Sequence, residues 1–152
     1  MRSAPVSLRA QAIRLLARRE YARSELERRL IAKGAPRSEV GPVLDELIAQ
    51  GYLSDARYAR AMAAQKAGGY SRRSIAEGLK SKGIARTDIE QALDEAEIDD
   101  EKALRALWQR RFGKPPADER EKARQVRFLQ ARGFALSAIL KLVREAARTA
   151  GA

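Results

Sequence analysis

Apolar residues recur at helical spacing along the chain. One set falls at positions i, i+3, i+4, i+7 and i+8, which places it on one face of a helix. Its members are Val40, Val43, Leu44, Leu47 and Ile48. The same stripe returns 49 residues later as Ile89, Ala92, Leu93 and Ala96, and 50 residues after that as Ile139, Leu142, Val143 and Ala146. No stretch alternates apolar and polar residues over a strand's length. The pattern predicts an all-α chain with an internal repeat.

Two further segments with helical spacing precede each copy of this stripe. The nearer segment is marked by Leu26, Leu30 and Ile31, then by Ile75 and Leu79, then by Val126 and Leu129. The earlier one is marked by Leu8, Ala12, Leu15 and Leu16, then by Tyr58 and Met62, then by Leu104, Leu107 and Trp108. Trp108 is therefore expected in the core. We predict nine helices in three tandem three-helix repeats, at residues 5–53, 54–98 and 99–148, forming an elongated and curved molecule.

The second helix of each copy ends in a basic residue followed by glycine. These pairs are Lys33-Gly34, Lys82-Gly83 and Arg132-Gly133. Glycine suits a helix C-terminus, where one residue takes a positive φ, and the basic side chain complements the negative end of the helix dipole. Ser38, Thr87 and Ser137 follow at equivalent positions. They are predicted to cap the third helices, and Glu90 completes a capping box with Thr87.

The composition removes several kinds of chemistry. The 152 residues include no Cys and no His, which excludes disulfides, thiolate chemistry, common zinc sites and imidazole catalysis. Gly68-Gly69 lacks the Lys-Ser/Thr of a phosphate-binding loop, and the acidic run from Asp94 to Glu101 has no partner Lys or second carboxylate motif for a two-metal centre. We therefore expect no enzyme activity, no metal and no cofactor. Met1–Pro5 leads into no apolar segment, and no membrane span is present, so a cytoplasmic protein is expected.

Charge is unevenly distributed along the chain. There are 31 Lys and Arg against 20 Asp and Glu, which gives a formal net charge of +11. Residues 57–86 hold eight basic side chains and only one acidic one, Glu77, whereas residues 88–101 hold only acidic charges. Such segregation favours a polyanionic partner or an acidic protein groove for the basic faces. The alternative is that these are simply solvated helix surfaces.

Several stretches resemble the bacterial RecX family. They are Leu16–Leu26 with Leu30 and Lys33-Gly34, the more specific Gly51-Tyr52-Leu53-Ser54-Asp55-Ala56-Arg57-Tyr58-Ala59, Ile75 with Leu79 and Lys82-Gly83-Ile84, and Arg132-Gly133-Phe134. The likeness covers about residues 8–146. It implies a nine-helix, three-repeat protein that binds the recombinase RecA and usually restrains it. Family members often have Ser or Thr where Ala22 stands, as Ser71 does in the second repeat, so the helix after Ala22 is expected to start more weakly.

Eight residues are candidates for contact with a partner or with DNA. They are Arg57, Tyr58, Arg72, Arg73, Lys80, Lys82, Arg127 and Arg132. Arg72 and Arg73 are the strongest, because two positive charges at a helix N-terminus oppose the dipole and gain nothing locally. Arg57 and Tyr58 could point from the groove between repeats toward a partner. Alternatively, residues 51–55 only end one repeat and cap or ion-pair near the start of the next helix.

Two functions follow from these observations. In the first, the resemblance implies a monomeric regulator that lies in the helical groove of a RecA–DNA filament and touches DNA weakly, without sequence preference. In the second, tandem helix-turn-helix units read a DNA sequence. Against the second, the chain has no Asn and little Gln to read base edges, and it has no dimerisation zipper.

Overall fold

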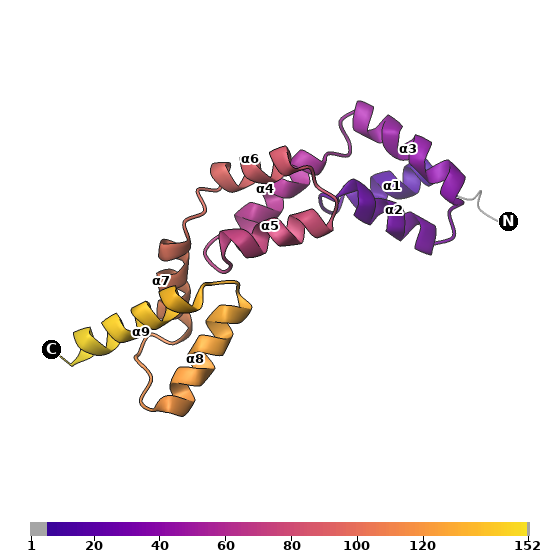
Figure 1. Ribbon diagram of the computed structural model, residues 1–152. Helices are drawn as coiled ribbons and strands as arrows, with labels where there is room; N and C mark the ends of the chain where they lie inside the picture. The colour runs from indigo at the N-terminus through magenta and orange to yellow at the C-terminus, as the bar shows by residue number, and fades with distance from the viewer. Residues whose placement is uncertain (1–5, 152) are drawn as a thin grey trace. The chain divides into compact units, whose positions relative to one another are not determined.

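The secondary structure of residues 6–151, which the computed structural model describes, is entirely helical (Figure 1). The elements are α1 (Leu8–Leu16), α2 (Arg23–Ala32), α3 (Arg37–Ala49), α4 (Asp55–Lys66), α5 (Arg72–Ser81), α6 (Arg86–Glu95), α7 (Asp100–Arg111), α8 (Glu119–Ala131) and α9 (Leu136–Ala150). These nine helices of the described residues confirm the all-α prediction. Pro5, where the first repeat was predicted to begin, and the rest of the segment Met1–Pro5 lie outside the described residues.

Two compact units are formed by the described residues. The first contains residues 6–61 and 79–92, and the second contains residues 62–78 and 93–151. In the first unit α1, α2 and α3 pack on one another, and in the second α9 packs against α7 and α8 (Figure 1). The repeat limits at 53/54 and 98/99 stay predictions.

The core of each unit contains most of the apolar residues predicted from the sequence, but Ile48 of the first stripe is 43% exposed. In the first unit the buried cluster is Ala12, Leu15, Tyr21, Leu26, Leu30, Val40, Leu44, Leu47 and Leu53. In the second it is Ala103, Leu104, Leu107, Trp108, Leu129, Phe134, Ile139, Leu142 and Val143. Trp108 is a core residue, as expected, and its indole Nε1 donates to Gln125 Oε1 at 2.9 Å, which satisfies the one polar atom of its ring.

The glycine that ends each second helix has the predicted backbone conformation. Gly34, Gly83 and Gly133 have φ values of +103°, +77° and +93°. One residue beyond each glycine, the backbone N–H turns back to the helix: Ala35 donates to Leu30 O, Ile84 to Leu79 O and Phe134 to Leu129 O. These bonds satisfy carbonyls that the helix end would leave without partners.

The prediction that Ser38, Thr87 and Ser137 cap the third helices is wrong. These helices begin one residue earlier, at Arg37, Arg86 and Leu136, so each hydroxyl residue is already inside its helix. Pro36 and Ala135 precede α3 and α9 and make no side-chain capping bond. Instead, backbone carbonyls start the first turns: Pro36 O accepts from Glu39 N, Ala85 O from Ile89 N and Ala135 O from Ile139 N. The short connection after each glycine leads the chain directly into the next helix.

Candidate partner-binding surfaces

The N-terminus of α2 is capped by a carboxylate from the next repeat. Ala22 precedes α2 and has no side-chain oxygen, as noted from the sequence. Asp55 Oδ1 accepts from the Arg23 backbone N–H at 2.8 Å, and the Arg23 side chain pairs with Asp45. This carboxylate satisfies the N–H of the first helical residue and complements the positive end of the helix dipole. Ser54, not Asp55, caps α4, through its Oγ and the Arg57 N–H.

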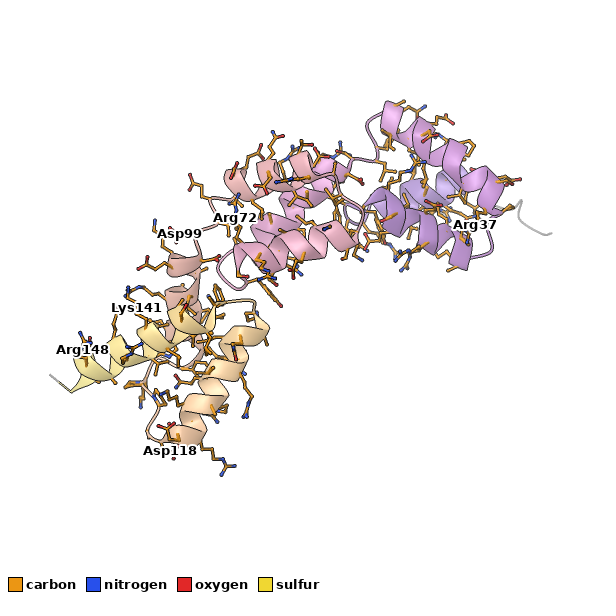
Figure 2. All side chains as sticks on the ribbon, in the orientation of Figure 1. Arg37, Arg72, Asp99, Asp118, Lys141 and Arg148 are labelled. Carbon is orange, nitrogen blue, oxygen red and sulfur yellow. The ribbon has the colours of Figure 1, made fainter. Side chains whose placement is uncertain are left out.

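The second unit repeats this arrangement at α5. Asp100 Oδ1 accepts from the Arg72 backbone N–H at 2.8 Å, and the Arg72 side chain pairs with Asp94 at 2.8 Å. Arg72 and Asp94 lie 49 residues after Arg23 and Asp45, so the repeat conserves the ion pair as well as the cap. Ser71 adds its own cap, since its Oγ accepts from Ser74 N at 3.0 Å. Figure 2 labels Arg72 at the start of α5 and Asp99 just before α7.

The expectation that Arg72 and Arg73 gain nothing locally is therefore wrong. Arg72 is ion-paired with α6, and Arg73 Nε lies 3.1 Å from Glu77 Oε1, one turn along the same helix. The acidic third helix and the capping carboxylate offset the unfavourable dipole at this N-terminus. The two arginines differ in exposure, however, because the Arg73 side chain is 85% exposed and that of Arg72 is 34% exposed. Arg73 is thus the better placed of the pair for an external contact.

Lys82 and Arg132 precede positive-φ glycines and fasten one repeat to another within each unit. In the first unit, the carbonyl of Lys82 accepts from Ser24 Oγ, and its ammonium lies 3.4 Å from Glu25 Oε2. In the second unit, the carbonyl of Arg132 accepts from Ser71 N at 2.9 Å, and its Nη1 donates to Gly69 O at 3.2 Å. Both candidates therefore have structural contacts on the repeat that precedes them.

Glu25 pairs with two cations of the first unit, Arg19 and Lys82. Burial alone would raise the pKa of this carboxyl, but the hydrogen bond from Arg19, with the positive charges of Arg19 and Lys82, outweighs burial and holds the pKa below its usual value. The same hydrogen bond raises the pKa of Arg19. The carboxylate thus stays ionised while it joins α2 to the end of α5.

The prediction that Tyr58 points toward a partner is wrong, because its side chain is buried. Tyr58 is only 4% exposed. Burial raises the pKa of its phenol, and the negative charge of Glu25 raises it further. Its neighbour Arg57 is engaged as well, with Nε 3.0 Å from Glu20 Oε1. The segment around residues 51–58 is therefore mainly a junction between repeats.

Lys80 on α5 and Arg127 on α8 are exposed, as a partner contact would require.

The aromatic residues that were not predicted as part of a site lie around Arg132. Arg132 Cζ lies 4.5 Å from the centroid of the Tyr70 ring and 5.1 Å from that of Phe128. The spacing of four residues between Phe128 and Arg132 was a signal for this contact, because it places both on one face of α8.

One concave surface of the second unit is a pocket of about 230 Å³ between α7 and α9. Leu104, Phe134 and Leu142 line it, and Arg105 pairs with Glu145 at 3.4 Å on its wall. Apolar side chains beside paired charges suit binding contacts.

Residues 6–151 contain no group of three or more acidic residues placed to hold a metal ion. None of the helices in this range is both long and apolar enough to cross a membrane.

Nine helices within residues 6–151, two of them capped by an aspartate of the next repeat, define an all-α tandem-repeat protein. Family models identify the repeats. They match residues 9–47 as "RecX, first three-helix domain", 54–93 as "RecX, second three-helix domain" and 99–143 as "RecX, third three-helix domain". The chain belongs to the RecX family, and it consists of tandem three-helix domains.

Curated relatives agree over almost the full length. The chain is 46% identical over 141 residues to "Regulatory protein RecX" of Pseudomonas savastanoi pv. phaseolicola, covering 91% of each chain. It is 45% identical over 142 residues to the protein of the same name from Ectopseudomonas mendocina, covering 92% of this chain and 95% of that one. The crystal structure of RecX from Lactobacillus salivarius has the same fold, with a TM-score of 0.64, 18% identity, and 91% of this chain and 93% of that one covered.

Proposed function

We propose that this protein binds the recombinase RecA in the helical groove of its filament on DNA and inhibits the recombinase, ATPase and coprotease activities. The observation that carries this proposal is the match of three successive domains to the RecX family across the chain. A regulator of this kind needs no catalytic centre. It would meet RecA in the cytoplasm, as a monomer.

The distribution of charge supports the same partner. The net charge of +11 favours association with a filament that carries DNA, because Lys and Arg near phosphates release counterions. The exposed cations Arg73, Lys80 and Arg127 are available for acidic protein surfaces or for phosphates. Successive repeats give one molecule several contact surfaces, so it could engage more than one RecA protomer. Inhibition is then expected at well below one molecule per protomer.

A titration tests this proposal. RecA is assembled on single-stranded DNA with ATP, and ATP hydrolysis and strand exchange are followed as the protein is added. A small basic protein of unrelated fold, at equal total charge, controls for displacement of RecA by charge alone. We expect both activities to fall at substoichiometric amounts of this protein and not of the control. Unchanged activities at an equimolar ratio would refute the proposal. A tight, sequence-selective footprint on naked DNA at physiological salt would favour a helix-turn-helix regulator instead.

A further inference from the structure

Five side chains of the second unit form a row in which cations and aromatic rings alternate. Lys66 Nζ lies 5.0 Å from the centroid of the Tyr70 ring. Arg132 Cζ lies 4.5 Å from the same centroid and 5.1 Å from that of Phe128, and Arg111 Cζ lies 4.8 Å from Phe128. The residues come from the end of α4, the connection to α5, α8 with its C-terminus, and the end of α7. We call this set the cation–aromatic row.

The cation–aromatic row is fixed in place by contacts on both sides. Arg132 Nη1 donates to Gly69 O at 3.2 Å, which holds the guanidinium beside the Tyr70 ring. Phe112 packs edge-on against Phe128, with ring centroids 5.6 Å apart and an interplanar angle of 88°. Stacking against rings orders a guanidinium before any ligand arrives, so less side-chain entropy is lost on binding.

The positive charges of this row are not neutralised by acidic side chains. Within residues 6–151, no carboxylate lies within 4.0 Å of the charged nitrogens of Lys66, Arg111 or Arg132. The neighbouring rings attract these cations through their quadrupoles but carry no opposing net charge. In contrast, Arg57 and Lys82 are paired with glutamates. Arg124 lies one turn before Phe128 on α8, so helical spacing extends the row by a further basic residue.

We propose that the cation–aromatic row binds the sugar–phosphate backbone of single-stranded nucleic acid. A guanidinium positioned beside a ring can still direct N–H groups outward to phosphate oxygens. The interleaved Tyr70 and Phe128 rings add apolar surface that unstacked bases can contact, which is the combination typical of single-strand binding. An acidic protein surface could also contact the charges and the rings, but the alternation of cations with rings along one row matches single-strand binding more closely. The inference rests on the DNA contact in the proposed function and gives it a location.

Binding of a fluorescent oligo(dT) strand, measured by anisotropy over a series of salt concentrations without RecA, tests this assignment. The row variant Lys66→Gln/Arg111→Gln/Arg132→Gln is compared with Arg14→Gln/Arg28→Gln/Arg37→Gln, which removes the same charge from exposed arginines of the first unit. Figure 2 labels one of these, Arg37. The row variant should lower the slope of log K against log salt by about 2, since each lost phosphate contact removes roughly 0.7 for single strands. The control should lower it by less than about 0.7.

Further variants keep the result decisive. Should the triple variant lose helicity by circular dichroism, Arg111→Gln alone, at an exposed position, should lower the slope by about 0.7. Arg132→Lys keeps the charge but not the flat guanidinium, so it should weaken binding at constant slope. Equal changes in the salt slope for the row and control variants would overturn the site. An equal loss of affinity of the row variant for a duplex and for oligo(dT) would overturn the single-strand assignment.

Normal oligo(dT) binding by the row variant, together with weakened binding to RecA, would identify an acidic protein surface as the ligand instead. Because RecA is absent from the first assay, failure there leaves the proposed regulation of RecA standing.

Discussion

Gly133 is the most crowded of the glycines in the described residues. A Cβ added there would clash with Ser71 Oγ and would lie 2.7 Å from Ser74 Cβ, and φ is +93°. Gly34, the equivalent residue of the first repeat, has a similar φ of +103° but no atom within 4 Å of an added Cβ. Both glycines therefore need a left-handed backbone conformation, but only Gly133 also needs the space that a side chain would occupy.

We predict that Gly133→Ala destabilises the protein more than Gly34→Ala. Strain at positive φ should cost each variant about 1–2 kcal/mol of unfolding free energy. Gly133→Ala should lose about 1–3 kcal/mol more, because the methyl group must displace the start of α5. Urea unfolding followed by circular dichroism measures both values. Equal losses would show that Ser71 and Ser74 move aside freely, and would contradict a cost from their close approach to Gly133.

At the scale of elements, the helices and the C-terminal ends of the second helices were predictable from local signals, whereas the predicted N-caps of the third helices were wrong. The apolar stripe at Val40 and Leu44, and the glycines such as Gly83, involve residues within one or two turns. The carboxylate caps were not predictable, because Asp55 and Asp100 act on helices that begin 32 and 28 residues earlier. The helical spacing of apolar residues within one segment does not show which residues of a distant segment will contact that helix.

The same limit explains the errors at the candidate site. The ion pair of Arg72 with Asp94 depends on how α5 and α6 pack, which the sequence pattern does not give. Tyr58 shares helical spacing with Met62, and this local pattern indicates the burial that the structure shows. The cation–aromatic row joins four segments, and only the pair Phe128 and Arg132 shares one helix face.

Arg72 and Arg73 provide a prediction at this scale. Arg72→Ala should lower the unfolding free energy by about 1 kcal/mol or less, because its ion pair with Asp94 is largely exposed. Arg73→Ala should change it by less than about 0.5 kcal/mol, the value of an i,i+4 pair. Binding to the RecA filament should nevertheless fall in Arg73→Ala, and less so at high salt. Thermal melting with filament co-sedimentation checks both parts. A marked loss of stability in Arg73→Ala, or unchanged co-sedimentation, would exclude Arg73 from the interface.

Glu25 gives the link between α2 and α5 a definite pH dependence. Its pKa in the folded protein lies below the ordinary value of 4.5, so ionised Glu25 stabilises the folded state above that pH. The stabilisation is lost as the pH falls through the folded-state pKa, because protonation then removes the pairing with Arg19 and Lys82. The difference in unfolding free energy between wild type and Glu25→Gln should be constant above about pH 5.5 and shrink in acid. Denaturant unfolding at several pH values measures it; a difference that widens in acid would contradict the depressed pKa.

At the scale of the whole molecule, one joining device is used twice. In each unit, an aspartate at the start of a repeat caps the second helix of the preceding repeat. The backbone carbonyl of the basic residue before a glycine accepts a hydrogen bond from a serine at the start of that same helix. Stability in repeat proteins comes from such neighbouring contacts added to that of each repeat. Many of the charged side chains therefore stabilise the fold through caps and ion pairs. The cations of the cation–aromatic row have no acidic partner within the described residues and can bind a partner instead.

Electron microscopy of RecA filaments on single-stranded DNA, mixed with this protein in the presence of a slowly hydrolysed ATP analogue, tests whether the protein binds in the filament groove. We expect additional density that follows the helical groove of the filament, in contact with more than one RecA protomer. Filaments that keep an empty groove at saturating protein, or that bind the protein only at their ends, would contradict it.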